Sequence, residues 1–337
     1  MKKFLLFVGV IFALLSNQYA FSQANVLDPN DPDVVFTTNN QPAAPTWNQI
    51  SKWGHTSRLG WNPYSYGYKS YIFRGMVFRL KFPKTYAHNV ADGKIYPSII
   101  FLHGLGEPGT IYDNENQLVH GGQQHAFDIN NGVFDGFMIY PQSTSGYLQA
   151  YFPFIKDLTD SLAKYVKLDL DRINVGGLSS GGQAVWDFPQ QQQYAKIIAS
   201  IEPISAAQYE DVNYFASHIT IPIFVANGGK DIAPYPSTVT DVLNSYRNLG
   251  GNIIQAFFPE QAHGAWNAFW ADSRYWPFIN SAHKANPLVY FQRDAFCPSD
   301  PINAKLGLQA GFAAYEWQKD GVTIPGATTK DLTVTTY

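Results

Sequence analysis

The sequence predicts an α/β protein with a mainly parallel sheet and helices on both faces, followed by a small all-β segment. Short apolar runs typical of buried strands alternate with helix-like segments over residues 71–258. Alternation at this spacing indicates right-handed strand–helix–strand units, which build parallel sheets. After about residue 285 the pattern changes to short β-prone runs separated by turn signals.

Seven apolar runs are expected to form the strands of the main sheet. They are short and contain β-branched or aromatic residues, as buried strands do. The first is read as a strand or a hairpin, and the second ends directly before a His-Gly pair. The seven runs are 71–82, 96–102, 137–140, 172–178, 197–201, 221–226 and 253–258.

Three helices are expected between these strands. Residues 152–166 carry apolar side chains at helical spacing on one face. Residues 181–188 follow a strand directly, and residues 239–249 are closed by Gly250 and Gly251, which suit a helix C-terminus.

The N-terminus has the features of an export signal. Lys2 and Lys3 form a positive region, and residues 4–15 are an unbroken apolar run. This run is too short to cross a bilayer of about 30 Å as a helix but suits a signal peptide. Small residues at Ser22 and Ala24 then supply a cleavage site.

We place cleavage after Ala24, with Ala20 as the alternative, so residues 1–24 are the predicted signal peptide. The mature protein is then expected to be secreted or periplasmic. Residues 25–47 are rich in Asn, Asp, Pro and Thr and read as an extended leader, and residues 48–284 form the main domain.

Charge and composition argue against several classes of protein. The chain has 23 Lys and Arg against 26 Asp and Glu, a net charge of −3, and no basic run, which argues against a nucleic-acid or anionic-membrane binder. No later stretch is apolar enough for membrane insertion. The lone cysteine, Cys297, has no partner for an internal disulfide, so the fold must depend on its core. No phosphate loop, nucleotide fingerprint or zinc spacing is present, so no cofactor or metal is expected. We expect the protein to be a monomer.

The motif that carries the chemistry is Gly177-Leu178-Ser179-Ser180-Gly181, a G-x-S-x-G sequence between a predicted strand and a predicted helix. This context predicts a sharp turn that points the Ser179 hydroxyl out of the sheet at a helix N-terminus. The residues two positions before and after Ser179 must have almost no side chain, or they would collide with the adjacent strand and helix. Both of them, Gly177 and Gly181, are glycine. Ser179 is therefore the candidate nucleophile.

A second motif follows the strand that ends at Leu102. Acyl transfer needs two N–H donors for the negative oxygen of its tetrahedral intermediate. We expect one from Ser180, next to the nucleophile, and the other from Leu105, with Gly104 as the alternative. His103 is expected to brace this loop rather than to react.

A serine nucleophile needs a base, and the base needs an orienting acid. Asp231 and His263 each follow a predicted strand, at the sheet edge where open α/β sheets place their sites, and in the order Ser, acid, His. Asp231 is the candidate acid and His263 the candidate base. Glu202 also follows a strand and is the chief rival acid. Other carboxylates weighed for that role are Glu210, Asp211 and Asp241.

The run 171–182 (DRINVGGLSSGG) resembles the nucleophile elbow of secreted α/β-hydrolase esterases. The most similar group is the one that contains polyhydroxybutyrate depolymerases and feruloyl or acetyl-xylan esterases. The pair His103-Gly104 resembles the oxyanion loop of that group. The resemblance implies the α/β-hydrolase fold and a Ser-His-Asp triad.

Two later segments extend the resemblance. Residues 228–231 (GGKD) with Pro234 resemble the acid loop of the group, and His263 with Trp266 resembles its base loop. The motifs occur in the order found in the group and cover about residues 71–276.

Several residues are candidates for contact with a substrate. Trp186 and Trp266 lie close in sequence to the nucleophile and the base. Residues 112–125 depart from the pattern of the group and are expected to form an insert over the site, with His120 as a contact. A metal site at His120 and His125 is set aside because no third ligand accompanies them. An aromatic stretch is expected either to pack on the sheet edge or to form a wall for carbohydrate rings; its members are Trp53, Trp61, Tyr64, Tyr66 and Tyr68.

The tail, residues 286–337, resembles an immunoglobulin-like module of the kind attached to secreted enzymes. Residues 315–321 (YEWQKDG) resemble its central strand and turn, with Trp317 as a core residue. The chain stops at Tyr337, before the last two strands of such a sandwich, so we expect an incomplete module.

The leading function hypothesis is a secreted serine hydrolase of carboxylic esters that works through an acyl-enzyme. The expected substrates are feruloyl or acetyl esters on polysaccharide side chains, and the alternative is an aliphatic polyester of the polyhydroxybutyrate type. A serine peptidase of the same fold is a further alternative. The hypothesis from another class is a binding or adhesion protein that keeps a hydrolase-like fold without the activity.

Overall fold

The structure is a computed structural model. It describes residues 27–37, 39–45, 48–56, 58–206, 221–251, 253–284, 290–291, 301–308, 312 and 314–335. The predicted signal peptide and Cys297 lie outside the described residues, and so does part of the predicted immunoglobulin-like module.

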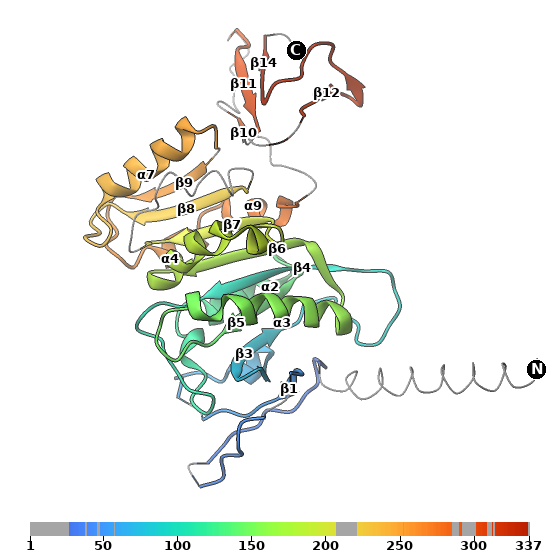
Figure 1. Ribbon diagram of the computed structural model, residues 1–337, viewed down its shortest axis with the longest axis vertical. Helices are drawn as coiled ribbons and strands as arrows, with labels where there is room; N and C mark the ends of the chain where they lie inside the picture. The colour runs from blue at the N-terminus through green and yellow to red at the C-terminus, as the bar shows by residue number, and fades with distance from the viewer. Residues whose placement is uncertain are drawn as a thin grey trace, which may run out of the picture.

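A twisted sheet runs through the centre of the main domain (Figure 1). The strands from β5 to β9 in the sheet order are parallel, whereas β1, β2 and β3 form an antiparallel edge. The mainly parallel sheet predicted from the sequence is therefore confirmed. In spatial order its nine strands are β1 (Ser51–Lys52), β2 (Tyr68–Phe73), β3 (Met76–Lys81), β5 (Phe137–Pro141), β4 (Tyr96–Leu102), β6 (Leu168–Leu178), β7 (Ser200–Ile204), β8 (Ile223–Gly228) and β9 (Ile253–Phe258).

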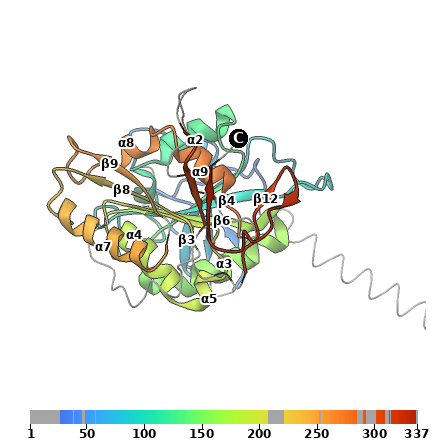
Figure 2. The same cartoon turned by 90° about the horizontal axis from the view of Figure 1, so that it is seen from above.

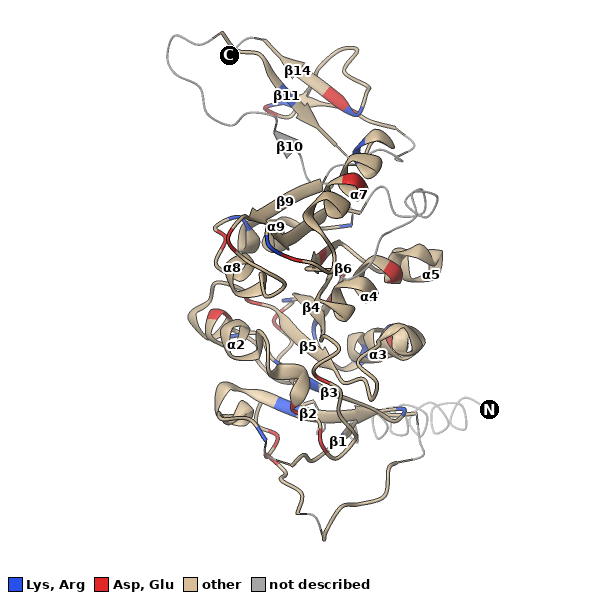
Figure 3. Cartoon of the chain, turned by 90° about the vertical axis from the view of Figure 1, so that its left-hand side faces the viewer, with Lys and Arg blue, Asp and Glu red and all other residues tan. Residues whose placement is uncertain are grey.

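Helices cover both faces of the sheet, which gives three layers (Figures 2 and 3). One face carries α2 (Gly122–Asn131), α8 (Trp266–Trp270) and α9 (Tyr275–Ser281). The other carries α3 (Phe152–Tyr165), α4 (Ser180–Asp187), α5 (Gln192–Ala195) and α7 (Pro236–Asn248). Short 3₁₀ turns occur at η1 (Pro63–Tyr66), η2 (Asn116–Leu118), η3 (Gln149–Tyr151) and η4 (Phe188–Gln190).

Each face of the sheet has its own apolar core. The larger cluster joins the sheet to α3, α4 and α7 through residues such as Leu158, Val185 and Leu243. The second joins it to α2, α8 and α9 through residues such as Ile129 and Phe269. Because a sheet buried on both faces has no polar face, its strands read as continuous apolar runs, which is why they were visible in the sequence.

Two expectations about these elements need correction. Strand β7 begins at Ser200 rather than Ile197, because the chain first completes helical turns after α5, with Ile198 N–H donating to the Ala195 carbonyl at 3.4 Å. Residues 112–125 do not form a separate insert, although His120 within them reaches the site. Glu115 is fully buried, and the segment leads into α2, which packs on the sheet, so it forms part of the connection from β4 to β5.

Small antiparallel sheets follow the main domain. Strands β10 (Tyr290–Phe291), β11 (Ala304–Gly307) and β14 (Asp331–Val334) form one, and β12 (Gln318–Lys319) pairs with β13 (Val322–Thr323). Trp317 is 7% exposed, and its indole N–H donates to the Thr329 carbonyl at 2.8 Å. The immunoglobulin-like assignment stays a prediction. Within the described part of the chain, no helix has the length and apolar character needed to cross a bilayer.

Candidate active site

Ser179 lies on a strained turn between β6 and α4. Its backbone has φ 55° and ψ −122°, a region that residues with a side chain rarely adopt. The Ser179 N–H donates to the Ile204 carbonyl at the end of β7, at 2.9 Å, which ties the turn to the neighbouring strand.

The two glycines around the turn sit against backbone and leave no room for a side chain. A Cβ on Gly177 would lie 2.7 Å from the Gly181 carbonyl oxygen and 2.8 Å from that of Leu102. A Cβ on Gly181 would overlap the carbonyl oxygens of Leu102 and His103. The turn therefore holds the end of β4 directly against the nucleophile.

The side chains of Ser179, His263 and Asp231 form a hydrogen-bonded chain. His263 Nε2 lies 2.9 Å from Ser179 Oγ, and His263 Nδ1 lies 2.9 Å from Asp231 Oδ2 and 3.2 Å from Oδ1. Asp231 can only accept at Nδ1, so the ring carries its proton there and accepts the Ser179 hydroxyl proton at Nε2. The Asp231 side chain is 1% exposed and that of His263 is 38% exposed, so the acid is shielded and the base is open to a ligand.

The loops that carry the acid and the base are linked by backbone hydrogen bonds. Gly229 N–H donates to the Phe258 carbonyl and Lys230 N–H to the Gln261 carbonyl, each at 2.8 Å. Asp231 Oδ1 also accepts from Ala233 N–H, at 2.9 Å. The spacing between acid and base is thus set by backbone, not by side-chain packing alone.

His103 braces the loop that precedes Leu105. Its Nδ1–H donates to the Gly104 carbonyl, and its Nε2 accepts from Ser143 N–H, both at 2.9 Å. This pattern requires a neutral ring, and burial lowers the pKa of His103 to about 4. Ser180 is the first residue of α4, so its N–H has no partner within the helix. Leu105 is 51% exposed.

The loop after β5 was missed by the sequence analysis. Ser180 Oγ donates to the Gly146 carbonyl at 2.9 Å. Gly146 in turn lies against Leu105, because a Cβ there would be 2.9 Å from Leu105 Cα. This loop, which also contains Ser143, thus connects Ser180 and Leu105, the two residues expected to supply N–H donors. Only the tight turn signal Ser145-Gly146 marked it in the sequence.

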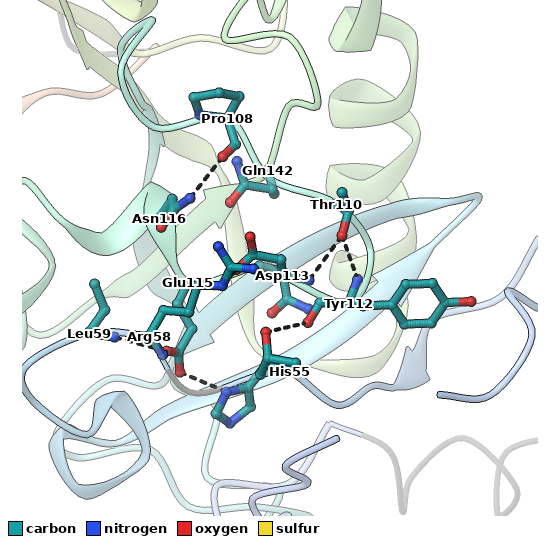
Figure 4. A network of polar contacts seen from close by, with 12 residues as sticks. His55, Arg58, Leu59, Pro108, Thr110, Tyr112, Asp113, Glu115, Asn116 and Gln142 are labelled. Carbon is teal, nitrogen blue, oxygen red and sulfur yellow. Dashed lines mark hydrogen bonds and ion pairs between the residues drawn. The ribbon is translucent and has the colours of Figure 1, made fainter. Parts of the chain in front are cut away.

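The chain beyond the Leu105 loop is fixed by a buried polar network (Figure 4). Glu115 contacts His55 Nδ1 at 2.7 Å and Arg79 at 3.4 Å, and accepts from Arg58 N–H at 2.8 Å. Burial acts to lower the pKa of His55, but hydrogen bonds to Asp33 and Glu115 raise it. The cluster joins this segment to the β2–β3 edge of the sheet and to the N-terminal residues.

Two of the three predicted contact residues lie at the site. The Trp266 ring meets that of His263 edge-on at 6.0 Å, and the His120 ring lies 4.9 Å from that of Trp266. Trp186 does not line the site: it is 3% exposed and packs in the larger core cluster with Val225 and Leu243. Its place on α4 turns it toward the sheet, so its proximity in sequence to Ser179 was misleading.

Glu202, the rival acid, lies inside the sheet and is 1% exposed. Ser200 Oγ is 2.5 Å from Glu202 Oε1 and 2.6 Å from Asn174 Oδ1. The Ser200 hydroxyl has a single proton and can donate to only one of these two oxygens. The contact between Ser200 and Glu202 therefore needs a proton from the Glu202 carboxyl group when the hydroxyl donates to Asn174. Burial indeed raises the pKa of Glu202 to about 8. Within the described part of the chain, no hydrogen bond or ion pair joins it to His263.

The arrangement has the parts of a nucleophile, a base and an orienting acid, with N–H groups beside the nucleophile. Among the residues that the structure describes, no group of three His, Cys, Asp or Glu side chains is placed to hold a metal ion.

Comparison with known proteins identifies the fold. No protein-family model matches the chain. No curated protein matches it either. A solved thermostable esterase superposes with a TM-score of 0.55 at 21% identity, over 64% of this chain and 63% of that one. The chain therefore has the α/β-hydrolase fold and spans less than two thirds of that esterase.

Other similar structures superpose less well. A ferulic acid esterase has a TM-score of 0.47 at 17% identity, over 60% of this chain and 91% of that one. An acylaminoacyl peptidase from Pyrococcus horikoshii has a TM-score of 0.46 at 14% identity, over 62% of this chain and 40% of that one.

The substitution Gly181→Ala should unfold or strongly destabilise the protein. Its methyl group would overlap backbone oxygens that cannot move aside, so we expect a loss of about 3 kcal/mol in the free energy of unfolding. Gly60→Ala is the matched control, because no atom lies within 4 Å of the new Cβ. Urea unfolding measures both, and equal stabilities would contradict the packing described.

The substitution Glu202→Gln should change how stability depends on pH. The pKa is about 8 in the folded protein and near its ordinary 4.5 when unfolded, so between these values only the unfolded chain loses the proton. The free energy of unfolding therefore falls as pH rises from about 4.5 to 8. The glutamine side chain cannot ionise, so the variant lacks this pH-dependent loss. Its free energy of unfolding relative to that of the wild type should therefore rise across that window. If the free energies of unfolding of the two proteins change in parallel with pH, Glu202 ionises as readily in the folded protein as in the unfolded chain.

Proposed function

We propose that the protein is a serine hydrolase that cleaves carboxylic esters through an acyl-enzyme. The observation that supports this most is the pair of 2.9 Å contacts that link Ser179 to His263 and His263 to Asp231. A buried acid, a half-exposed base and a nucleophile on a strained turn are the arrangement that acyl transfer requires.

In the first half of the proposed reaction, Ser179 Oγ attacks the ester carbonyl carbon while its proton passes to His263 Nε2. The negative oxygen of the tetrahedral intermediate accepts from the N–H groups of Ser180 and Leu105. Asp231 holds the Nδ1–H tautomer and stabilises the imidazolium. The C–O bond then breaks, and His263 gives its proton to the departing alcohol.

In the second half, water attacks the acyl carbon and loses its proton to His263. The same N–H groups receive the negative oxygen, and the bond to Ser179 Oγ breaks as the serine regains a proton. The carboxylic acid leaves and the site returns to its starting state. None of these steps calls for a cofactor.

Within this activity, we place the substrate among esters carried by polysaccharides. A groove of about 390 Å³ is lined by Trp61, Tyr66, Gln123, Phe127 and Asn267, together with Val119, Gly121, Gln124 and Trp270. Its lining includes the sequence neighbours of two residues at the site: Val119 and Gly121 flank His120, and Asn267 follows Trp266. Aromatic faces and amide groups together suit the apolar and hydroxyl faces of sugar rings. The apolar run at the N-terminus supports a location outside the cytoplasm for this activity.

Labelling with a fluorophosphonate tests the nucleophile. The wild type should take up one label per chain, and Ser179→Ala should take up none, because the reagent needs an activated serine. Turnover of 4-nitrophenyl acetate should fall by about 10⁴-fold in the same variant. Absence of labelling in a folded wild type would favour a binding protein with this fold, and labelling that survives in Ser179→Ala would move the nucleophile elsewhere.

The substitution Phe127→Ala tests the groove. Phe127 is 58% exposed, and stacking of a ring on it should contribute about 1 kcal/mol, so KM for an acetylated xylo-oligosaccharide should rise about fivefold relative to KM for 4-nitrophenyl acetate. Phe257→Ala is the control, since Phe257 is 48% exposed on β9 and does not line the groove. Higher kcat/KM on 3-hydroxybutyrate oligomers or on peptide amides would instead support a polyesterase or a peptidase.

A further inference from the structure

Glu107 is a buried carboxylate that the proposed mechanism leaves unused. It lies two residues beyond Leu105 and is 8% exposed, and its N–H donates to the Gly104 carbonyl at 3.3 Å. Its Oε2 is buried and has no hydrogen-bond partner among the described residues. A buried polar oxygen without a partner is costly, so its position calls for an explanation.

The carboxylate lies beside the candidate nucleophile. A Cβ placed on Gly104 would be 2.8 Å from Glu107 Oε2 and 3.3 Å from Ser179 Cβ, so the two side chains approach the same point on Gly104. The other oxygen, Oε1, lies 3.5 Å from His120 Nε2. His120 packs on Trp266, which meets His263 edge-on. Glu107 therefore belongs to the ring of side chains around Ser179.

A bare negative charge at this place works against the proposed reaction. It would oppose the oxyanion that forms beside Leu105, because like charges repel strongly where water is excluded. A ligand group that donates a hydrogen bond to Oε2 would both satisfy the oxygen and disperse its charge. His120 faces Oε1, which leaves Oε2 for the ligand.

We propose that Glu107 Oε2 accepts a hydrogen bond from a hydroxyl group of the alcohol portion of the substrate, next to the ester oxygen. This rests on the proposed esterase function and narrows its substrate class to esters of polyols. A hydroxyl fits better than an ammonium group for two reasons. The ring nitrogen Nε2 of His120 already lies 3.5 Å from the same carboxylate, and the groove is lined by neutral amides and aromatic rings with no acidic residue.

Three small acetate esters, each with a different group at the second carbon of the alcohol portion, test the proposal. In 2-hydroxyethyl acetate a hydroxyl lies next to the ester, in 2-methoxyethyl acetate this hydroxyl is blocked, and 2-(dimethylamino)ethyl acetate carries a cation instead. The measured quantity is the ratio of kcat/KM for the hydroxyl ester to that for the methoxy ester. We expect a ratio of about ten in the wild type, since a hydrogen bond to a charged group is lost in the methoxy ester.

In Glu107→Ala the ratio should fall to about one, and in Glu107→Gln, which keeps the shape and a weaker acceptor, it should fall severalfold. Glu316→Gln, the same change on an exposed surface of the C-terminal segment, should leave the ratio as in the wild type. Fluorophosphonate labelling of Ser179 in each variant shows that the site is folded, independently of Glu107.

If the labelled proteins hydrolyse both esters with the same ratio, the assignment of Glu107 is wrong while the esterase proposal stands. If the Glu107 variants lose activity selectively on the cationic ester, the carboxylate recognises an ammonium group, and the hydroxyl proposal is also wrong. If the folded wild type hydrolyses none of the three esters, both proposals fail together.

Discussion

The close approach of two strand ends at Ser179 is the constraint from which the rest of the site follows. A serine at positive φ persists only where its surroundings hold it, and here Gly177 and Gly181 pack directly on the carbonyls that end β4. The same contact brings the loop of Leu105 beside the serine. One packing relation therefore fixes both the direction of the hydroxyl and the place of the N–H groups that would meet an oxyanion.

The remaining parts of the site are held by polar links between loops rather than by a shared element. Backbone hydrogen bonds join the loops that carry Asp231 and His263, and His103 and Gly146 connect the Leu105 loop to the chain after β5. Two apolar cores hold the strands beneath these loops. Such a site is preorganised, because backbone hydrogen bonds hold the loops that carry its residues to the strand ends.

The sequence allowed the sheet, most of its strands and the convergence of Ser179, Asp231 and His263 to be anticipated, because parallel strands end at one edge and leave the same signature each time. It did not reveal α2, α8 and α9. In α2 and α8 the apolar residues are interrupted by polar ones that line the groove. It placed Trp186 wrongly, since nearness along the chain says nothing about which face of a short helix meets the core. Glu107 and Gly146 were missed because their importance arises only when distant loops meet.

The most direct test of the account is a crystal structure of the protein after reaction with a fluorophosphonate. The account predicts phosphorus bonded to Ser179 Oγ, with the phosphoryl oxygen within hydrogen-bond distance of the N–H groups of Ser180 and Leu105 and with His263 still paired to Asp231. Phosphorus on another residue, or a phosphoryl oxygen turned away from both N–H groups, would contradict it.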